Sequence, residues 1–180
     1  MTTGTYDSSL CERPNVRHQP RNNNNNNNYY YYSAAGIPVT KKPTGLFRSD
    51  GKRTDSLTLV PWQNGKSLCW DVTVICPLSD SYVSGAAHEA GATAEVAATR
   101  KEAKYAGITG RYLFEPIVVE TLGPLNSSAR LLMNDLGKKI SCMSGEARAT
   151  GFLFQRISVL VQRFNAVLLR DSLPAVDPTD

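Results

Sequence analysis

The sequence lacks the features that mark membrane, secreted and zinc-binding proteins. It has no run of 18 apolar residues, so it predicts no membrane span. Its first ten residues are polar and do not resemble the apolar region of a secretory signal. Its four cysteines are scattered without a Cys-x2-Cys pair, and only two histidines could join them as zinc ligands. We therefore expect an intracellular chain with reduced thiols.

Positive charge is concentrated in the first third of the chain. Residues 1–54 contain eight Lys or Arg against three Asp or Glu, whereas residues 55–180 contain twelve against thirteen. The net charge of +4 thus comes from the N-terminal part. The remainder lacks the cationic excess that is typical of a globular DNA-binding face.

A low-complexity tract interrupts this N-terminal part. Asn22 to Asn28 is an unbroken asparagine run, and four tyrosines follow it directly. Such a tract buries too little apolar surface to offset its chain entropy. It is either an aggregation-prone or partner-binding tract, or a simple repeat without selected structure. We predict a disordered arm over residues 1–44, a folded domain over 45–172 and a disordered tail over 173–180.

The remaining sequence alternates between strand and helix patterns. Asn64-Gly65 predicts a hairpin between strands at about 56–62 and 67–76. An alanine-rich helix is expected from Ser84 to about residue 106, and a buried strand at 112–120. Two further helices are expected, one from Asn126 or the next residue to about 140, and one of about 20 residues ending before Pro174. This order predicts an α/β fold.

Asp71 is the most informative residue because it interrupts an apolar strand. A carboxylate there is costly unless it is paired or binds a metal. A regular hairpin places Asp55 opposite residue 74, within a few residues of Asp71, so the two carboxylates could converge. Two such carboxylates suit Mg2+ or Mn2+. Alternatively, Asp55 opens a turn and Asp71 pairs with an internal arginine.

The alanine-rich helix supplies candidate cationic partners. Its small residues recur at helical spacing and would let it lie close to the sheet, and the same stripe continues to Lys101, Lys104 and Tyr105. A lysine on this face could approach a metal site or a phosphate. Both lysines could equally extend to solvent from the end of the helix.

Taken together, these residues resemble a known nuclease family. The segments that carry the resemblance are Lys52-Arg53-Thr54-Asp55, Leu59-Val60-Pro61-Trp62, Gly65, Trp70-Asp71-Val72-Thr73-Val74, Lys101-Glu102-Ala103-Lys104-Tyr105 and Phe114-Glu115-Pro116-Ile117-Val118-Val119-Glu120-Thr121-Leu122-Gly123. They resemble the restriction-like endonuclease at the C-terminal end of non-LTR retrotransposon polyproteins, a member of the PD-(D/E)xK class. The resemblance extends from about residue 45 to 170.

The resemblance implies a restriction-endonuclease-like fold and a metal-dependent nuclease site. Asp55 and Asp71 would bind Mg2+, and the lysine that usually stands at Thr73 would be replaced by Lys104 or Lys101. Arg53 and Lys52 would contact the nucleic-acid backbone. The implied reaction nicks target DNA so that the freed 3′ end primes reverse transcription. The implied partners are DNA, element RNA and a reverse transcriptase domain on a longer polyprotein, and the implied location is the nucleus.

The sequence also departs from the family pattern. Thr54 replaces the proline expected before Asp55, and no Tyr-x-Asp-Asp of a reverse transcriptase occurs. The helix and first strand that normally precede the hairpin would coincide with the asparagine and tyrosine runs. We therefore expect these N-terminal elements to be missing. The alternative to an active nuclease is an inactive retroelement remnant that at most binds nucleic acid.

Overall fold

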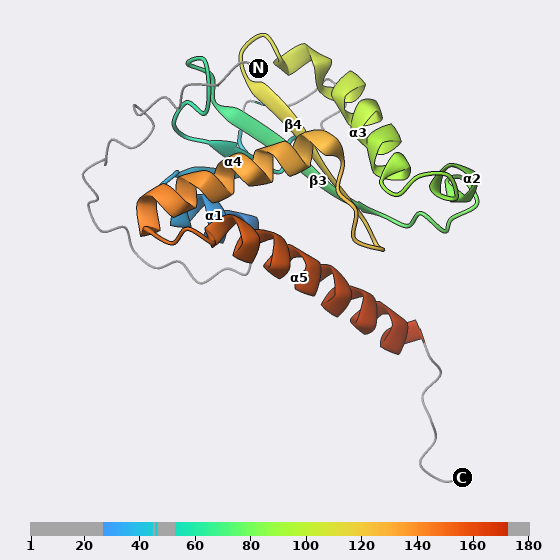
Figure 1. Cartoon of the computed structure of the whole chain (residues 1–180). Helices are drawn as coiled ribbons and strands as arrows, with labels where there is room; N and C mark the ends of the chain where they lie inside the picture. Colours follow the sequence, from blue (N-terminus) through green and yellow to red (C-terminus); the bar gives the residue numbers. More distant parts are fainter. Residues whose placement is uncertain (1–26, 45, 47–52, 173–180) are drawn as a thin grey trace, which may run out of the picture.

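The computed structural model describes residues 27–44, 46 and 53–172. They form a four-stranded sheet with helices packed against it (Figure 1). Its elements are α1 (Asn27–Ala34), β1 (Val39–Lys41), β2 (Ser56–Thr58), β3 (Leu68–Ile75), α2 (Val83–Ala86), α3 (Ala92–Tyr105), the 3-10 turn η2 (Ala106–Ile108), β4 (Leu113–Glu120), α4 (Ser127–Ser144) and α5 (Ala149–Ser172). The strand order is β1-β2-β3-β4, in which the first three strands pair antiparallel and β4 lies parallel to β3. The predicted α/β class is confirmed.

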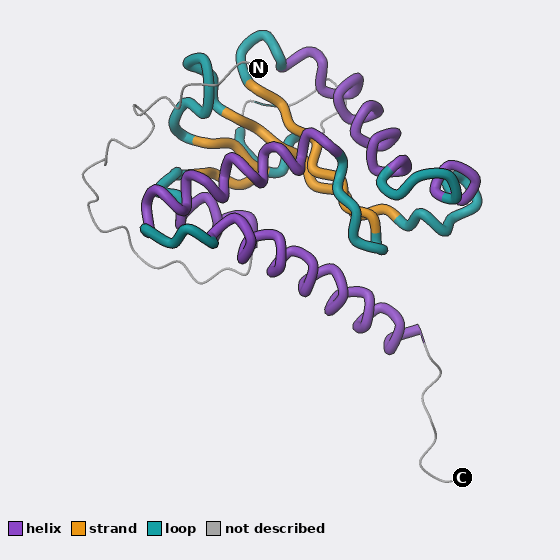
Figure 2. Tube along the Cα trace, viewed as in Figure 1, coloured by secondary structure: helices purple, strands orange, loops and turns teal. Residues whose placement is uncertain are grey.

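Helices cover both faces of the sheet, which forms the middle layer in Figure 2. On one face, Trp70 and Ile117 pack against residues of α1, α4 and α5. On the other face, Val118 packs against the alanines of α3. The apolar run in β4 is therefore buried on both sides, as its composition predicts.

The tyrosine run belongs to the fold, so the predicted boundary at residue 45 is wrong. Tyr31 and Tyr32 lie in α1 and are buried in the larger core, where the ring of Tyr32 stacks on Trp70 with centroids 4.4 Å apart. Val39 in β1 joins the same core. Aromatic rings provide the apolar area that asparagine lacks, so composition averaged over the tract concealed this helix. The other parts of the predicted arm and the predicted tail, residues 1–26 and 173–180, lie outside the described residues.

The hairpin forms at the predicted turn but with a different register. Asn64 and Gly65 both have positive φ, as a tight hairpin turn requires. Gln63 pairs with Lys66 at the tip, whereas Leu57 pairs with Cys69 at the base. Residues 59–62 bulge out between these two points, so β2 ends at residue 58 rather than 62. The bulge moves the partner of residue 55 from the expected position 74 toward position 71.

The predicted long helix is divided into α2 and α3 by an irregular segment. This segment ends at Gly91, whose φ of 91° is a left-handed conformation that glycine adopts readily. The helix that crosses the sheet is α3, and its start is fixed by the buried Glu120, whose Oε1 accepts a hydrogen bond from the Ala94 amide at 3.1 Å. Glu95 links α3 to the start of α4 by accepting hydrogen bonds from the Ser127 amide and hydroxyl. These contacts fix which residues of α3 face the sheet.

The last helix is confirmed as amphipathic, and it packs closely against α4 only near its start. A Cβ atom at Gly137 of α4 would lie 2.7 Å from the Cα of Thr150, so this crossing requires glycine. The stretch Ala149–Asp171 is long and apolar enough to cross a membrane by length and composition, although the sequence contains no continuous apolar run of that length. Little of this stretch is buried in the described structure.

Substitutions at Tyr32 test whether the tyrosine run is part of the folded domain. Its side chain is fully buried, so Tyr32→Ala should lower the free energy of unfolding by about 3–5 kcal/mol. Its hydroxyl finds no hydrogen-bond partner among the described residues, so Tyr32→Phe should change this energy by less than about 1 kcal/mol or increase it. Urea denaturation measures both effects.

Leu131→Ala is the matched control because this α4 side chain is 66% exposed. It should change stability by no more than about 0.5 kcal/mol. If Tyr32→Ala were as mild as the control, the tyrosine run would not be part of the core.

Candidate functional site

Asp71 lies in the middle of β3 on the face that α3 covers. Its neighbours Trp70 and Val72 belong to the core on the opposite face, because side chains alternate along a strand. The Asp71 side chain is only 13% exposed. The sheet therefore holds this carboxylate in the narrow layer between β3 and α3, where it needs a compensating charge.

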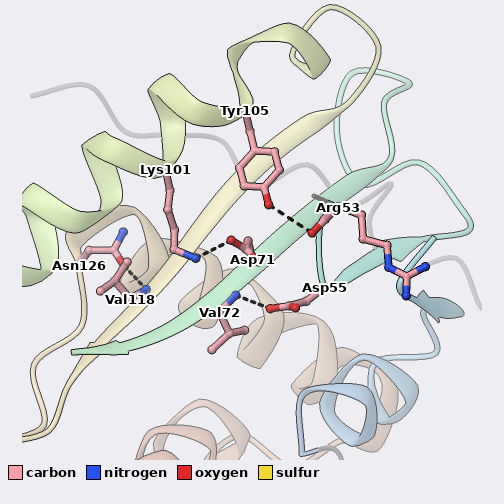
Figure 3. A network of polar contacts seen from close by, with 8 residues as sticks. All are labelled: Arg53, Asp55, Asp71, Val72, Lys101, Tyr105, Val118 and Asn126. Atoms are coloured by element: carbon pink, nitrogen blue, oxygen red, sulfur yellow. Dashed lines mark hydrogen bonds and ion pairs between the residues drawn. The ribbon is translucent and has the colours of Figure 1, made fainter. Parts of the chain in front are cut away.

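Asp55 lies directly before β2, next to Asp71. Its backbone amide donates to the Trp70 carbonyl at 3.0 Å, and its Oδ2 accepts a hydrogen bond from the Val72 amide at 2.7 Å (Figure 3). The Asp55 carbonyl accepts a further bond from the Lys42 amide, which ties it to the end of β1. These bonds hold Asp55 beside Asp71, and the two carboxylates interact, in a register three residues away from the one that a regular hairpin predicts.

The proximity of the two acids alters the titration of Asp55. Partial burial raises the pKa of the Asp55 carboxyl above its ordinary value. The hydrogen bond from the Val72 amide opposes this change, the adjacent Asp71 raises the pKa further, and Lys101 lowers it. Asp55 is therefore held where its negative charge is disfavoured unless a cation is close.

Lys101 provides that positive charge from α3. Its Nζ lies 2.5 Å from Asp71 Oδ2, and its side chain is only 15% exposed (Figure 3). The buried residues Ala94, Ala97 and Ala98 let α3 lie close enough to the sheet for this contact. Lys101 therefore does not extend to solvent, which was one of the two alternatives considered from sequence. Asp71 pairs with a lysine rather than with the arginine considered from sequence.

Lys104 lies nearly one helical turn further along α3. Its ammonium is 4.9 Å from the centre of the Tyr105 ring, and its side chain is half-buried. The structure thus distinguishes the two predicted lysines, because it gives Lys101 the ion pair with Asp71.

Tyr105 joins the end of α3 to the chain that leads into the site. Its ring is buried against Phe114 with centroids 4.6 Å apart, and its hydroxyl donates to the Arg53 carbonyl at 3.2 Å. The Arg53 side chain is exposed and extends away from the Asp71–Lys101 pair (Figure 3). Lys52, the other predicted nucleic-acid contact, lies outside the described residues.

The chemistry of this cluster suits a divalent cation with few protein ligands. In the described parts of the chain, no group of three or more His, Cys, Asp or Glu side chains gathers as a metal site. Asp55 and Asp71 could supply two carboxylates, and Mg2+ is commonly bound by one or two carboxylates together with water and substrate phosphate. This use fits the position of Asp55, whose pKa is raised first by burial and then by the adjacent Asp71, because a cation beside the two acids would offset both effects.

Two contacts of the site carried no clear signal in the sequence. The bond from Val72 to Asp55 depends on the bulge after β2, which a regular hairpin pattern does not reveal. The role of the Tyr105 hydroxyl depends on a backbone carbonyl 52 residues earlier in the chain. The spacing of Lys101 and Tyr105 placed both on one helix face but did not identify either partner.

Comparison with known proteins adds no relative. No family model, no curated protein and no solved structure matches this chain.

Replacing Asp55 with asparagine should stabilise the protein at neutral pH. The pKa of Asp55 is higher in the folded chain than its ordinary value of about 3.9, so stability falls as pH rises from that value through the folded pKa. The asparagine side chain would keep an oxygen that accepts from the Val72 amide. Urea denaturation should therefore show Asp55→Asn above the parent at pH 7, with the difference vanishing near pH 3.

Asp135→Asn is the control, because this carboxylate is exposed and pairs with Lys138 on the surface of α4. It should leave stability nearly unchanged at both pH values. A lower stability of Asp55→Asn at pH 7 would contradict the electrostatic strain assigned to Asp55.

Proposed function

We propose that this chain is the metal-dependent DNA endonuclease module of a retrotransposon, which nicks target DNA to prime reverse transcription. The observation that carries the proposal is the meeting of Asp55, Asp71 and Lys101 on one face of the sheet. This is the carboxylate pair and cation that the family resemblance requires. Phosphodiester hydrolysis uses these groups to bind a metal ion and to steady the charged phosphate.

The element order supports a restriction-endonuclease-like fold. A helix and a first strand normally precede the hairpin in the family, and α1 and β1 occupy those positions here. The tyrosine run lies in the helix α1, and Val39–Lys41 forms the strand β1, so the expectation that no helix and strand precede the hairpin is wrong. Helix α3 and strand β4 follow the hairpin in the expected order.

Asp55 and Asp71 would hold Mg2+ or Mn2+ through their carboxylate oxygens. Such an ion supplies a positive charge that offsets the negative charge developing on the phosphate. Lys101 holds its ammonium beside Asp71 and would orient the attacking water or contact a phosphate oxygen. In the family the lysine stands at the position that Thr73 occupies here, two residues after Asp71 and on the same face of β3. Lys101 reaches that face from α3 instead.

The reaction that suits priming breaks the bond between phosphorus and the 3′ oxygen. A water oxygen becomes bonded to phosphorus, and its proton ultimately leaves on the released 3′ hydroxyl, so the products are a 3′ hydroxyl and a 5′ phosphate. Arg53 is exposed beside the site and would contact the DNA backbone with Lys52. The element RNA and a reverse transcriptase on a longer polyprotein would be the further partners, and the nucleus the place of action.

A second candidate is an inactive retroelement remnant that at most binds nucleic acid. The Asp71–Lys101 ion pair favours it, because this pair satisfies the buried carboxylate without any metal. In that case the pair only stabilises the contact between β3 and α3.

A plasmid assay distinguishes the two candidates. With Mg2+, the chain should convert supercoiled plasmid to the nicked circle, and Asp71→Asn should lower the rate by about 100-fold or more. Chelation of the metal should stop nicking, and Mn2+ should restore it. Asp71→Asn keeps the size of the side chain and is therefore expected to fold, which circular dichroism can verify.

Absence of nicking by the folded parent chain would favour the inactive remnant. Nicking that survives Asp71→Asn would show that the activity arises elsewhere.

The two lysines should differ in their effect on nicking. Lys101→Met should lower the rate by about 100-fold or more, as expected for a group that acts at the reacting phosphate. Lys104→Met, one turn away on the same helix, is the matched control and should retain most of the activity. Equal losses in both variants would contradict the assignment of Lys101.

A further inference from the structure

The C-terminal half of α5 carries an apolar face that the described residues leave largely uncovered. Leu153 is 2% exposed where α5 packs against the body, whereas Phe164 and Leu168 on the same face are 61% and 67% exposed. Figure 1 shows this half of the helix extending past the sheet. Large exposed apolar faces of folded proteins commonly mark surfaces that bind another molecule.

The face follows a regular heptad pattern along most of the helix. Its seam consists of Leu153, Ile157, Leu160, Phe164 and Val167, which are spaced alternately by four and three residues. This spacing forms the seam that packs against another helix, with side chains of one helix inserted between those of the other. Only the first part of the seam is used within the described structure.

An apolar groove of about 300 Å3 lies beside this seam. It is lined by Tyr31 of α1, Val74 at the end of β3, Thr121 directly after β4, and residues of α5 that include Leu160 and Phe164. The Asn165 side chain donates to the Thr121 carbonyl at 2.5 Å, which holds α5 above the end of the sheet. The groove is therefore a formed feature of the fold.

Positive charge lines one edge of the seam. Arg156, Arg163 and Arg170 are seven residues apart and exposed. The first two directly precede the seam residues Ile157 and Phe164. Charges at this position select the partner of a helix pair. The complementary partner carries Asp or Glu along the facing edge.

Other occupants fit this charge pattern less well. A second copy offers few carboxylates, since Asp171 is the only acid of α5 and lies beside Arg170. A helix that spans a bilayer would place Arg156 and Arg163 in hydrocarbon. The undescribed segments at 1–26 and 173–180 contain four carboxylate side chains in all and no heptad pattern. DNA would meet the arginines but would leave Phe164 and its apolar neighbours unused.

We propose that this seam and groove bind an amphipathic α-helix from another polypeptide, with acidic residues along one edge of its apolar stripe. The proposal does not depend on the nuclease site, which lies on the opposite face of the sheet. Variants of α5 should therefore leave plasmid nicking unchanged.

A synthetic helical peptide of about three heptads, with leucine at the seam and glutamate at the flanking positions, tests the proposal. The full chain should bind this labelled peptide in a fluorescence anisotropy titration, and a matched peptide with lysine for glutamate should bind at least about tenfold more weakly. Phe164→Ser should weaken binding about tenfold. Arg163→Glu should reduce the preference for the glutamate peptide, because it removes one of the three arginines and adds a negative charge.

Leu131→Ser and Arg130→Glu are the controls, because both residues are exposed on α4 away from the groove. Neither should alter binding. Equal affinity for the two peptides, or no binding of either, would overturn the proposal. A stable dimer of the chain that Phe164→Ser dissociates would instead identify a second copy as the occupant, and binding to anionic vesicles without peptide binding would identify a lipid surface.

Discussion

The ion pair between Asp71 and Lys101 is the constraint around which the site is organised. A carboxylate inside the sheet is tolerated because an ammonium group reaches it from the helix on the same face. That contact requires α3 to lie close to β3 and β4 in a single rotational setting. The alanine stripe permits the close approach, and the Glu120 bond to the Ala94 amide fixes the setting. Packing and electrostatics therefore reinforce one another.

Much of this arrangement could be predicted from the sequence, because its signals are local or periodic. The turn at Asn64-Gly65, the buried run of β4 and the alanine stripe each define one element and its inward face. The hairpin placed Asp55 within a few residues of Asp71, whereas their direct apposition depends on the bulge after β2. What escaped prediction depends on contacts between distant segments, such as the Tyr105 hydroxyl on the Arg53 carbonyl. The choice between Lys101 and its neighbour on α3 likewise depends on the tertiary position of the helix.

The tyrosine-rich helix shows why composition misleads at the edge of a low-complexity tract. Asparagine contributes little to a core, whereas each tyrosine adds a large apolar ring. Because Tyr32 stacks on Trp70, the strand that carries Asp71 is supported from behind by this helix. The asparagine run is thus followed directly by tyrosines that belong to the core. The helix that contains the tyrosine run thus packs behind the strand that carries Asp71.

The bulge after β2 separates two parts of the hairpin that a regular ribbon would couple. In a regular ribbon, the number of residues between the two acids fixes whether they face each other. Here the pairing register differs between the tip and the base of the hairpin, and residues 59–62 form the bulge that accommodates the difference. The tip can therefore gain or lose residues while the acids stay aligned. Counting the interval between Asp55 and Asp71 is consequently a poor guide when related chains are sought, and the pairing of the base is the property to compare.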